Sequence, residues 1–191
     1  EQMMEDIIKW KKTDVGTEGG ELFGQNMLLD SQNLDWYAIG IGRMGYEDDY
    51  SAYLSILKNT VTQKYIQPDQ LDLQKATEWH RIALAVLSLG GDPTQAGTDP
   101  DGEKINLIAD GVYYRGRTQS LGSQGINGYI WGLIALDAMR YQVPEDATDT
   151  RDTILLKILE NQGSEGAFSL DGKSADLDVT AMALTALAPY Y

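Results

Sequence analysis

The sequence predicts an all-α fold in which helical hairpins stack into two concentric layers. Four segments begin with a carboxylate or amide and continue into an apolar helix rich in small residues. Their lead residues recur at intervals of about 40 to 50 residues, the length of a two-helix repeat with variable loops. These lead residues are Asp35, Glu78, Asn127 and Asp178. Such a repeat cannot bury its apolar face alone, so neighbours must stack around one concave face.

A more highly charged amphipathic segment precedes each lead helix. These segments cover residues 2–12, 50–65, 104–114 and 150–162. In the second segment, Tyr53, Leu57 and Val61 recur at helical spacing while the lysines fall elsewhere, as expected of a helix that is wetted on one side. We expect these segments to form the outer layer.

The lead helices themselves carry few charges, which is typical of helices that are buried on most sides. We expect them near residues 34–44, 71–89, 128–141 and 177–188. A glycine or proline follows each one, and these residues end helices through a left-handed cap or a missing amide hydrogen. The terminating residues are Gly45, Gly90, Pro144 and Pro189. These helices form the predicted inner layer.

Length and composition indicate one domain spanning residues 1–191. A chain of 191 residues with 42% hydrophobic content supports one sizeable core. The sequence contains no cysteine, which excludes disulfides, thiolate zinc sites and thiol nucleophiles. It also begins without a signal-peptide pattern, so either a signal peptide has been removed or the chain starts inside a longer protein. We favour the second interpretation.

Charge and hydropathy narrow the range of partners. The net charge of −14 and the pI near 4.3 would repel phosphate backbones and anionic lipid. No apolar stretch approaches the roughly 18 residues that a membrane span needs. We therefore expect no nucleic-acid partner and no insertion into a membrane.

Two motifs near the end of the chain carry a family resemblance. Gln162, Gly166 and Phe168 form Q-x-x-x-G-x-F, which resembles the Q-x-x-x-G-x-W repeat motif of terpenoid cyclases with Phe168 in place of tryptophan. Residues 176–181, D-L-D-V-T-A, resemble the D-x-D-D-T-A acid motif of class II terpenoid cyclases, with Val179 replacing the last aspartate. The chain thus resembles the prenyltransferase and squalene-oxidase repeat family. Within that family it resembles uncharacterised Gram-positive surface proteins.

The resemblance implies an α/α toroid, the fold that cobalamin carriers such as intrinsic factor also use. A closed toroid of the family has about six helical pairs, whereas this chain supplies about four, so we expect an incomplete ring. The resemblance also implies a secreted or cell-surface location. In a cyclase-like enzyme, Asp176 and Asp178 would be the catalytic acids.

Asp178 has two interpretations. As a general acid it would protonate an alkene or epoxide, and neighbouring carboxyl groups would adjust its acidity. As a structural residue it would cap the helix that it opens or interact with the helix dipole. We favour the structural role, because the other three repeats carry a polar residue at the same position and a catalytic acid in every repeat is not plausible. Val179 also removes the partner carboxylate of the family's motif.

The remaining candidates for chemistry are weak. His80 is the only histidine, so no pair of histidines can bind a metal, and no G-x-S-x-G nucleophile motif occurs. Glu78 and Arg81 beside His80 instead predict a polar network between inner helices. Residues 99–103 lack the ligand spacing of a calcium loop, and we interpret them as a solvated turn. We expect no metal site and no cofactor.

The sequence leaves three functional hypotheses. The first is a non-catalytic extracytoplasmic module that binds a small ligand or a partner protein on its concave face. The second is an enzyme like a terpenoid cyclase or prenyltransferase that acts on an isoprenoid. The third is a carbohydrate-active α/α barrel, although no signal selects a carboxylate pair. The candidate ligand-binding residues are Asp35, Trp36, Glu78, Trp79, Asn127, Tyr129, Trp131 and Asp178.

Overall fold

The computed structural model describes residues 2–23, 31–170 and 172–191, with only the backbone for residues 31–33. The regular structure in these ranges is helical, and extended pairing is limited to two isolated bridges, Thr98 with Lys104 and Gln162 with Phe168. The all-α prediction is therefore confirmed. None of the helices in these ranges is long and apolar enough to cross a membrane.

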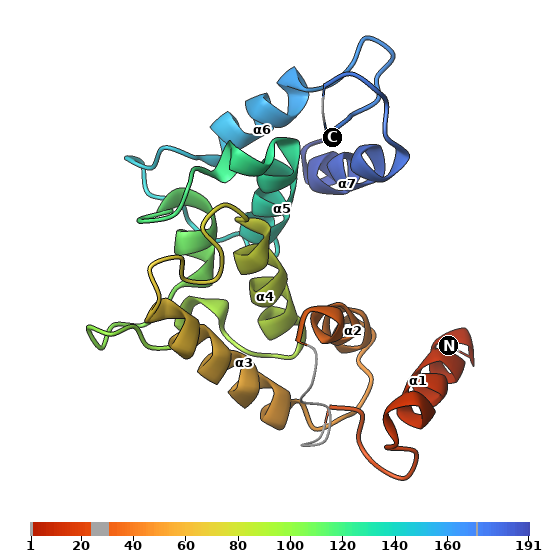
Figure 1. Cartoon of the computed structure of the whole chain (residues 1–191). Helices are drawn as coiled ribbons and strands as arrows, with labels where there is room; N and C mark the ends of the chain where they lie inside the picture. Colours follow the sequence, from red (N-terminus) through yellow and green to blue (C-terminus); the bar gives the residue numbers. More distant parts are fainter. Residues whose placement is uncertain (1, 24–30, 171) are drawn as a thin grey trace.

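Four helices form a continuous inner series. They are α2 (Ser31–Arg43), α4 (Thr77–Ser88), α5 (Ile126–Asp137) and α7 (Leu177–Leu187). Each packs against the next in chain order, α2 on α4, α4 on α5 and α5 on α7. Figure 1 shows this series following a curve, with α2 and α7 toward its two ends. The inner layer predicted from the repeats is present.

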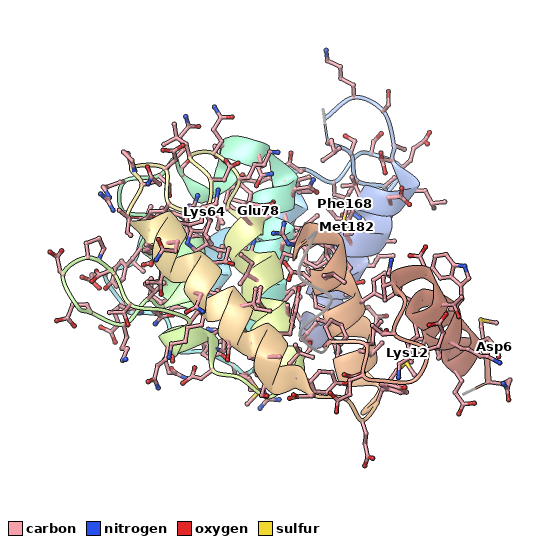
Figure 2. All side chains as sticks on the ribbon, turned by 60° about the horizontal axis from the view of Figure 1, so that its bottom comes forward. Asp6, Lys12, Lys64, Glu78, Phe168 and Met182 are labelled. Carbon is pink, nitrogen blue, oxygen red and sulfur yellow. The ribbon has the colours of Figure 1, made fainter. Side chains whose placement is uncertain are left out.

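The outer elements pack on the outside of this curved series of helices (Figure 1). Helix α3 (Tyr50–Tyr65) packs on α4, and α6 (Arg151–Glu160) packs on α5. Helix α1 (Gln2–Val15) lies beyond α2 at the end of the array (Figure 1), and Figure 2 shows it beside α2 from a second direction. In α1 only Ile8 is buried, so this helix packs much more loosely than the others.

The third outer segment differs from the prediction of a helix over residues 104–114. The structure has a short helical stretch that ends in η2, a π-helix over Ala109–Tyr113. The Asn106 Oδ1 atom accepts hydrogen bonds from the amides of Ile108 and Ala109, at 3.0 Å each, so the helical stretch starts later than predicted. Gly111 then lies directly on α4, where a Cβ atom would come within 2.7 Å of Trp79 Cβ. This contact holds η2 against the inner layer.

Two predicted boundaries of the inner helices were also wrong. Helix α4 begins at Thr77 rather than near residue 71, because Asp72 Oδ1 accepts the amides of Gln74 and Lys75 at 2.8 Å each and closes a turn instead. Helix α5 ends at Asp137 rather than near residue 141. Just after this end, Arg140 adopts a positive φ of 53°, and the amide of Tyr141 donates a hydrogen bond to the Leu136 carbonyl.

The start of α4 is completed by the following unit of the array. Gln124, at the end of the short helix η3 (Leu121–Gln124), directs its Oε1 atom at the first residue of α4. That oxygen accepts hydrogen bonds from the Thr77 amide at 3.2 Å and from the Thr77 hydroxyl at 3.1 Å. An amide that the helix leaves unpaired is thereby satisfied by a side chain from the next hairpin.

Glycines allow the inner elements to approach closely. A Cβ atom on Gly128 of α5 would clash with the Leu121 carbonyl, and one on Gly42 of α2 would clash with the Ser88 carbonyl. The backbone contacts of α5 with η3 and of α2 with the end of α4 therefore require glycine. Small residues in the inner helices therefore serve close contact between backbones at these two places.

Candidate functional site

The four lead residues lie at one common end of the inner layer. Glu78, Asn127 and Asp178 each occupy the second position of their helix, and Asp35 lies about one turn into α2. The last residues of the same four helices line one hollow at the other end, so the helices run in the same direction. The repeat alignment therefore placed the four lead residues at the same end of the inner helices, with Asp35 about one turn deeper than the other three.

Asp35 is the centre of a buried ionic network. Its carboxylate, which is fully buried, accepts hydrogen bonds from the Tyr53 hydroxyl at 2.5 Å and from Arg81 Nε at 2.8 Å. Arg81 Nη1 also donates to Glu78 at 2.7 Å. Burial raises the pKa of Asp35 above its usual value, although the bonds from Tyr53 and Arg81 act in the opposite direction.

This network joins three helices, because Asp35 belongs to α2, Tyr53 to α3, and Glu78 with Arg81 to α4. It confirms the predicted polar network between inner helices. The capping role predicted for this repeat position is wrong for Asp35, whose side chain bonds to other side chains and not to free amides. Because Asp35 is buried and fully engaged, its place is structural in the described chain.

A second buried series of hydrogen bonds surrounds Trp79. The indole Nε1 donates to the Tyr65 hydroxyl at 2.7 Å, and that hydroxyl donates to Asp110 Oδ2 at 2.7 Å. The Arg115 guanidinium lies over the Trp79 ring, 4.5 Å from its centroid. Trp79 is fully buried. The structure thus places this predicted ligand-binding residue inside the fold, between α4 and the outer layer.

His80 points in the same direction as Trp79, toward η2. Its Nε2 atom donates to the Gly111 carbonyl at 2.8 Å, whereas Nδ1 is buried without a hydrogen-bond partner in the described chain. Burial lowers the pKa of His80 to about 4. The imidazole is therefore neutral near pH 7 and joins α4 to η2, outside the ionic network of Asp35.

An aromatic pair lies on the opposite side of α4. Trp36 of α2 and Trp131 of α5 meet edge to face, with ring centroids 5.4 Å apart. These helices flank α4, whose Trp79 and His80 face α3 and η2, so the pair lies on the side of α4 away from these outer elements. Trp36 retains 48% of its exposure. An indole that is half exposed on this face can stack on a ligand.

The other two candidate ligand-binding residues on α5 are Tyr129 and Asn127. Tyr129 packs toward η3, where a Cβ atom on Gly122 would clash with its hydroxyl, so it does not share a surface with Trp36. Asn127 is partly buried, and its Oδ1 atom accepts no hydrogen bond in the described chain. Of the predicted ligand-binding aromatics, only Trp36 and Trp131 come together.

The two aspartates of the acid-like motif have different surroundings. Asp176 is the N-cap of α7, since its Oδ1 atom accepts the Val179 amide at 2.9 Å. Asp178 is exposed in the first turn of α7, where its negative charge interacts favourably with the helix dipole. The cap predicted at Asp178 is therefore found two residues earlier. Neither carboxylate is enclosed in the apolar cavity that a cyclase acid needs.

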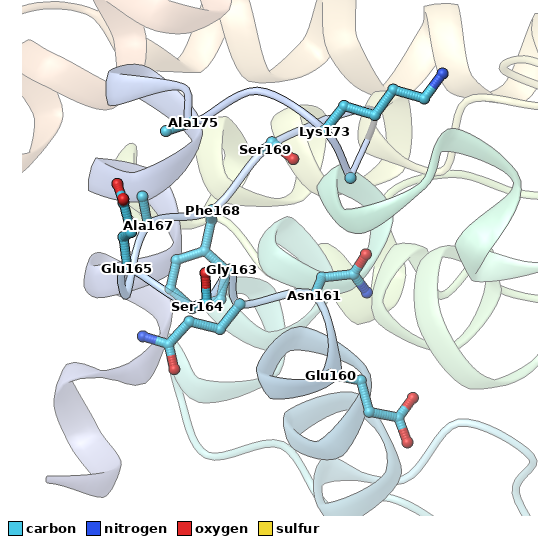
Figure 3. A pocket seen from close by; sticks show the side chains of 12 residues that line it. Glu160, Asn161, Gly163, Ser164, Glu165, Ala167, Phe168, Ser169, Lys173 and Ala175 are labelled. Atoms are coloured by element: carbon cyan, nitrogen blue, oxygen red, sulfur yellow. The ribbon is translucent and has the colours of Figure 1, made fainter.

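The Q-x-x-x-G-x-F segment forms a compact turn beside α7. Gln162 Nε2 donates to the Gly166 carbonyl at 2.8 Å, and Phe168 is buried with its amide bonded to the Thr180 hydroxyl at 2.9 Å. Figure 3 shows Asn161, Phe168 and Ser169 around a small open hollow of about 300 Å³ beside this turn. The glutamine and the aromatic residue of the motif thus hold this turn through local contacts.

The residues at 99–103 also behave as predicted, because Asp99 Oδ1 accepts the amides of Asp101 and Glu103 and closes an exposed turn. Across the described ranges, no group of three histidine, aspartate or glutamate side chains is placed to hold a metal ion. Four partners in the networks, Tyr53, Tyr65, Asp110 and Arg115, were not predicted. Tyr53 and Tyr65 followed the apolar pattern of α3, and nothing in that pattern shows where their hydroxyl groups point.

Comparison with protein-family models, with curated proteins and with solved structures gives no match. The class of protein therefore rests on the fold and on this arrangement of residues.

Proposed function

We propose that this chain is a non-catalytic α/α-toroid module that binds a small ligand or a partner protein on its concave face. The observation that carries the proposal is the contact of Trp36 with Trp131 on the inner side of α4. Exposed aromatic residues on a concave surface are typical of binding sites, because they offer large apolar area with few rotatable bonds. The ring is incomplete in this proposal, with about four helical pairs.

The polar groups of the inner layer support binding rather than catalysis. Asp35 and Arg81 neutralise one another inside the fold, and His80 is neutral and buried. Asp176 holds the start of α7, and Asp178 is open to solvent. A terpenoid-cyclase-like enzyme would need an activated acid in an apolar cavity, so this alternative lacks a supporting observation.

The location that we propose, secreted or at the cell surface, follows from the family resemblance. Immunoblots of culture supernatant and of protease-shaved cells from the native host would test it. Detection only inside intact cells would refute this part of the proposal and leave the binding proposal standing.

Saturation-transfer NMR with a panel of sugars, apolar lipids and corrinoids tests the binding proposal. We expect ligands that bind the wild-type chain to lose their signal in the Trp36→Ala and Trp131→Ala variants. Trp10→Ala is the matched control, because Trp10 is 59% exposed on α1 and lies outside this contact. Ligands that bind equally well to all three variants would show that the aromatic pair is not the site.

Enzymatic activity is tested separately by incubating the wild-type chain with squalene and with shorter isoprenoids. Cyclised products that disappear in the Asp178→Asn variant would favour the cyclase-like enzyme, since an amide cannot deliver the proton. We expect no product.

A further inference from the structure

The inner helices end around a second, larger hollow. It has a volume of about 750 Å³ and is lined by the last turns of α4, α5 and α7 together with Arg43 at the end of α2. This volume falls in the range of about 300 to 1,000 Å³ that small-molecule sites occupy. The hollow lies at the end of the inner layer opposite the lead residues.

Most of its wall is apolar. The apolar lining residues include Leu84, Leu87, Ile134, Met139, Ala186 and Pro189. The backbone around them offers few free polar groups, because the amides after the helix ends bond back to carbonyls of the last turns. Gly91 bonds to Val86 at 2.8 Å, and Tyr141 bonds to Leu136 at 2.9 Å. A ligand held here gains mainly from burying its own apolar surface.

One positive charge at the wall is left unbalanced. Asp137 is neutralised, since its Oδ1 atom accepts from Arg151 Nε at 2.8 Å and its Oδ2 atom accepts from the Tyr190 hydroxyl at 2.7 Å. Arg43 is exposed and forms no ion pair with any residue that the structure describes. A guanidinium group beside an apolar wall favours a ligand that carries a carboxylate.

The overall charge of the chain limits how much negative charge such a ligand can carry. With a net charge of −14, the molecule repels anions at distances where salt does not screen the interaction. A compact polyanion would meet this repulsion with little apolar area in compensation. A ligand with one negative charge and a large apolar body meets less repulsion and gains more from burial.

We propose that this hollow binds the monomeric form of a singly charged anionic amphiphile, a long-chain carboxylate, with its chain on the apolar wall and its head group at Arg43. The inference rests on the proposed binding function and names a ligand class for the inner layer. It assigns that ligand to the hollow at the helix ends and not to the Trp36–Trp131 pair.

Isothermal titration with three ligands of similar chain length tests the assignment. Decanoate, decanol and decyltrimethylammonium carry alkyl tails of nine or ten carbons and different head groups, so the apolar contribution of the tails is similar. We expect decanoate to bind most tightly and the ammonium compound least. Arg43→Met keeps an apolar stem and removes the charge, and we expect it to weaken decanoate about tenfold, the loss of one charge-assisted hydrogen bond, while decanol changes little.

Three further variants separate the explanations. Arg117→Met removes an exposed positive charge that does not line the hollow, and its decanoate affinity should match the wild type. Ala138→Trp fills the hollow from an exposed position and should abolish binding of both decanoate and decanol. Trp36→Ala should leave decanoate binding unchanged, because Trp36 does not line this hollow.

Several results would overturn the inference. They are the absence of decanoate binding, equal affinity for all three head groups, or equal loss in Arg43→Met and Arg117→Met. Co-sedimentation with phosphatidylglycerol vesicles but not with phosphatidylcholine vesicles, without binding of decanoate, would assign Arg43 to a lipid surface instead. If decanoate fails while other ligands still depend on Trp36, this inference falls and the proposed function stands.

Discussion

Arg81 of α4 lies 2.8 Å from the carboxylate of Asp35 in α2, and both side chains are largely removed from solvent. Forty-six positions separate them in the sequence, so the pair fixes how the first two hairpins meet. A buried carboxylate is tolerated when a guanidinium group and hydrogen-bond donors surround it. The Tyr53 hydroxyl supplies the second donor from α3.

Removing Arg81 should be strongly destabilising. We expect Arg81→Met to lower the free energy of unfolding by about 3 to 5 kcal/mol, because Asp35 would be left buried without its counter-charge. Urea unfolding followed by circular dichroism measures this change. Glu78→Gln is the matched control, since Glu78 meets Arg81 from a more exposed position, and it should cost at most about 1 kcal/mol.

The pH dependence of the stability of Arg81→Met gives a second check. Burial already raises the pKa of Asp35, so the folded state binds this proton more readily than the unfolded state and lower pH stabilises the fold through this group. Without Arg81, the pKa of Asp35 should be raised further. The stability difference between Arg81→Met and wild type should therefore shrink as the pH falls, and a constant difference would contradict the assignment.

His80 should make the fold acid-sensitive in a defined range. Its pKa is lowered from 6.5 to about 4, so between these values the unfolded chain binds a proton that the folded chain does not. Stability is therefore retained above pH 6.5 and lost as the pH falls toward 4. The expected loss is about 3 kcal/mol, at 1.36 kcal/mol for each pKa unit.

Because the chain has a single histidine, its Cε1 proton can be followed by NMR without assignment of other resonances. We expect no titration of that signal above pH 5 in the folded protein. His80→Gln keeps a donor for the Gly111 carbonyl and cannot titrate, so its stability should change less over the same range. A midpoint near 6.5 would show that the imidazole is open to solvent.

Substitutions of the two aspartates at the start of α7 should change the stability of the fold by clearly different amounts. Asp176→Ala removes the side chain that accepts the Val179 amide and should cost about 0.5 to 2 kcal/mol, whereas Asp176→Asn keeps an acceptor and should cost little. Asp178→Ala should stay within about 0.5 kcal/mol, because this side chain is exposed. Thermal unfolding of the three variants measures the order, and a larger loss at Asp178 would restore it as the cap.

The repeat positions predicted the inner layer well because burial leaves a strong trace in the sequence. Helices α2, α5 and α7 begin close to the expected residues, and their lead residues lie at one end. The boundary of α4 was missed because Leu71 and Leu73 extend the apolar pattern backwards, while the deciding contact is local. Asp72 binds two backbone amides and holds the segment in a turn.

The candidate site was less predictable, because it depends on which side chains meet across helices. The periodicity places Trp36 and Trp131 on inner helices, but it does not show that they touch over α4 while Trp79 turns outward. The same holds for the hollow beside Arg43, whose wall comes from the ends of four helices. Such sites depend on how each helix is rotated about its own axis, and the apolar pattern does not specify that rotation closely enough.

Two glycines with opposite surroundings test the close packing. Gly128→Ala would place a Cβ atom against the Leu121 carbonyl and should destabilise by about 1 to 3 kcal/mol or more. Gly40→Ala lies in α2 with nothing within 4 Å of the new atom, and it should stabilise by about 0.4 to 1 kcal/mol. Chemical unfolding of both variants measures the signs, and destabilisation by Gly40→Ala would place another element against that face.

The hydrogen bonds from Thr77 to Gln124 mean that one hairpin is finished by the next. Loss of the η3 turn would free the first amide of α4, so damage to one unit reaches backward along the chain. The units are consequently not interchangeable modules. A recombination or duplication that changes the number of hairpins keeps a sound junction only where the incoming segment brings its own acceptor to this place.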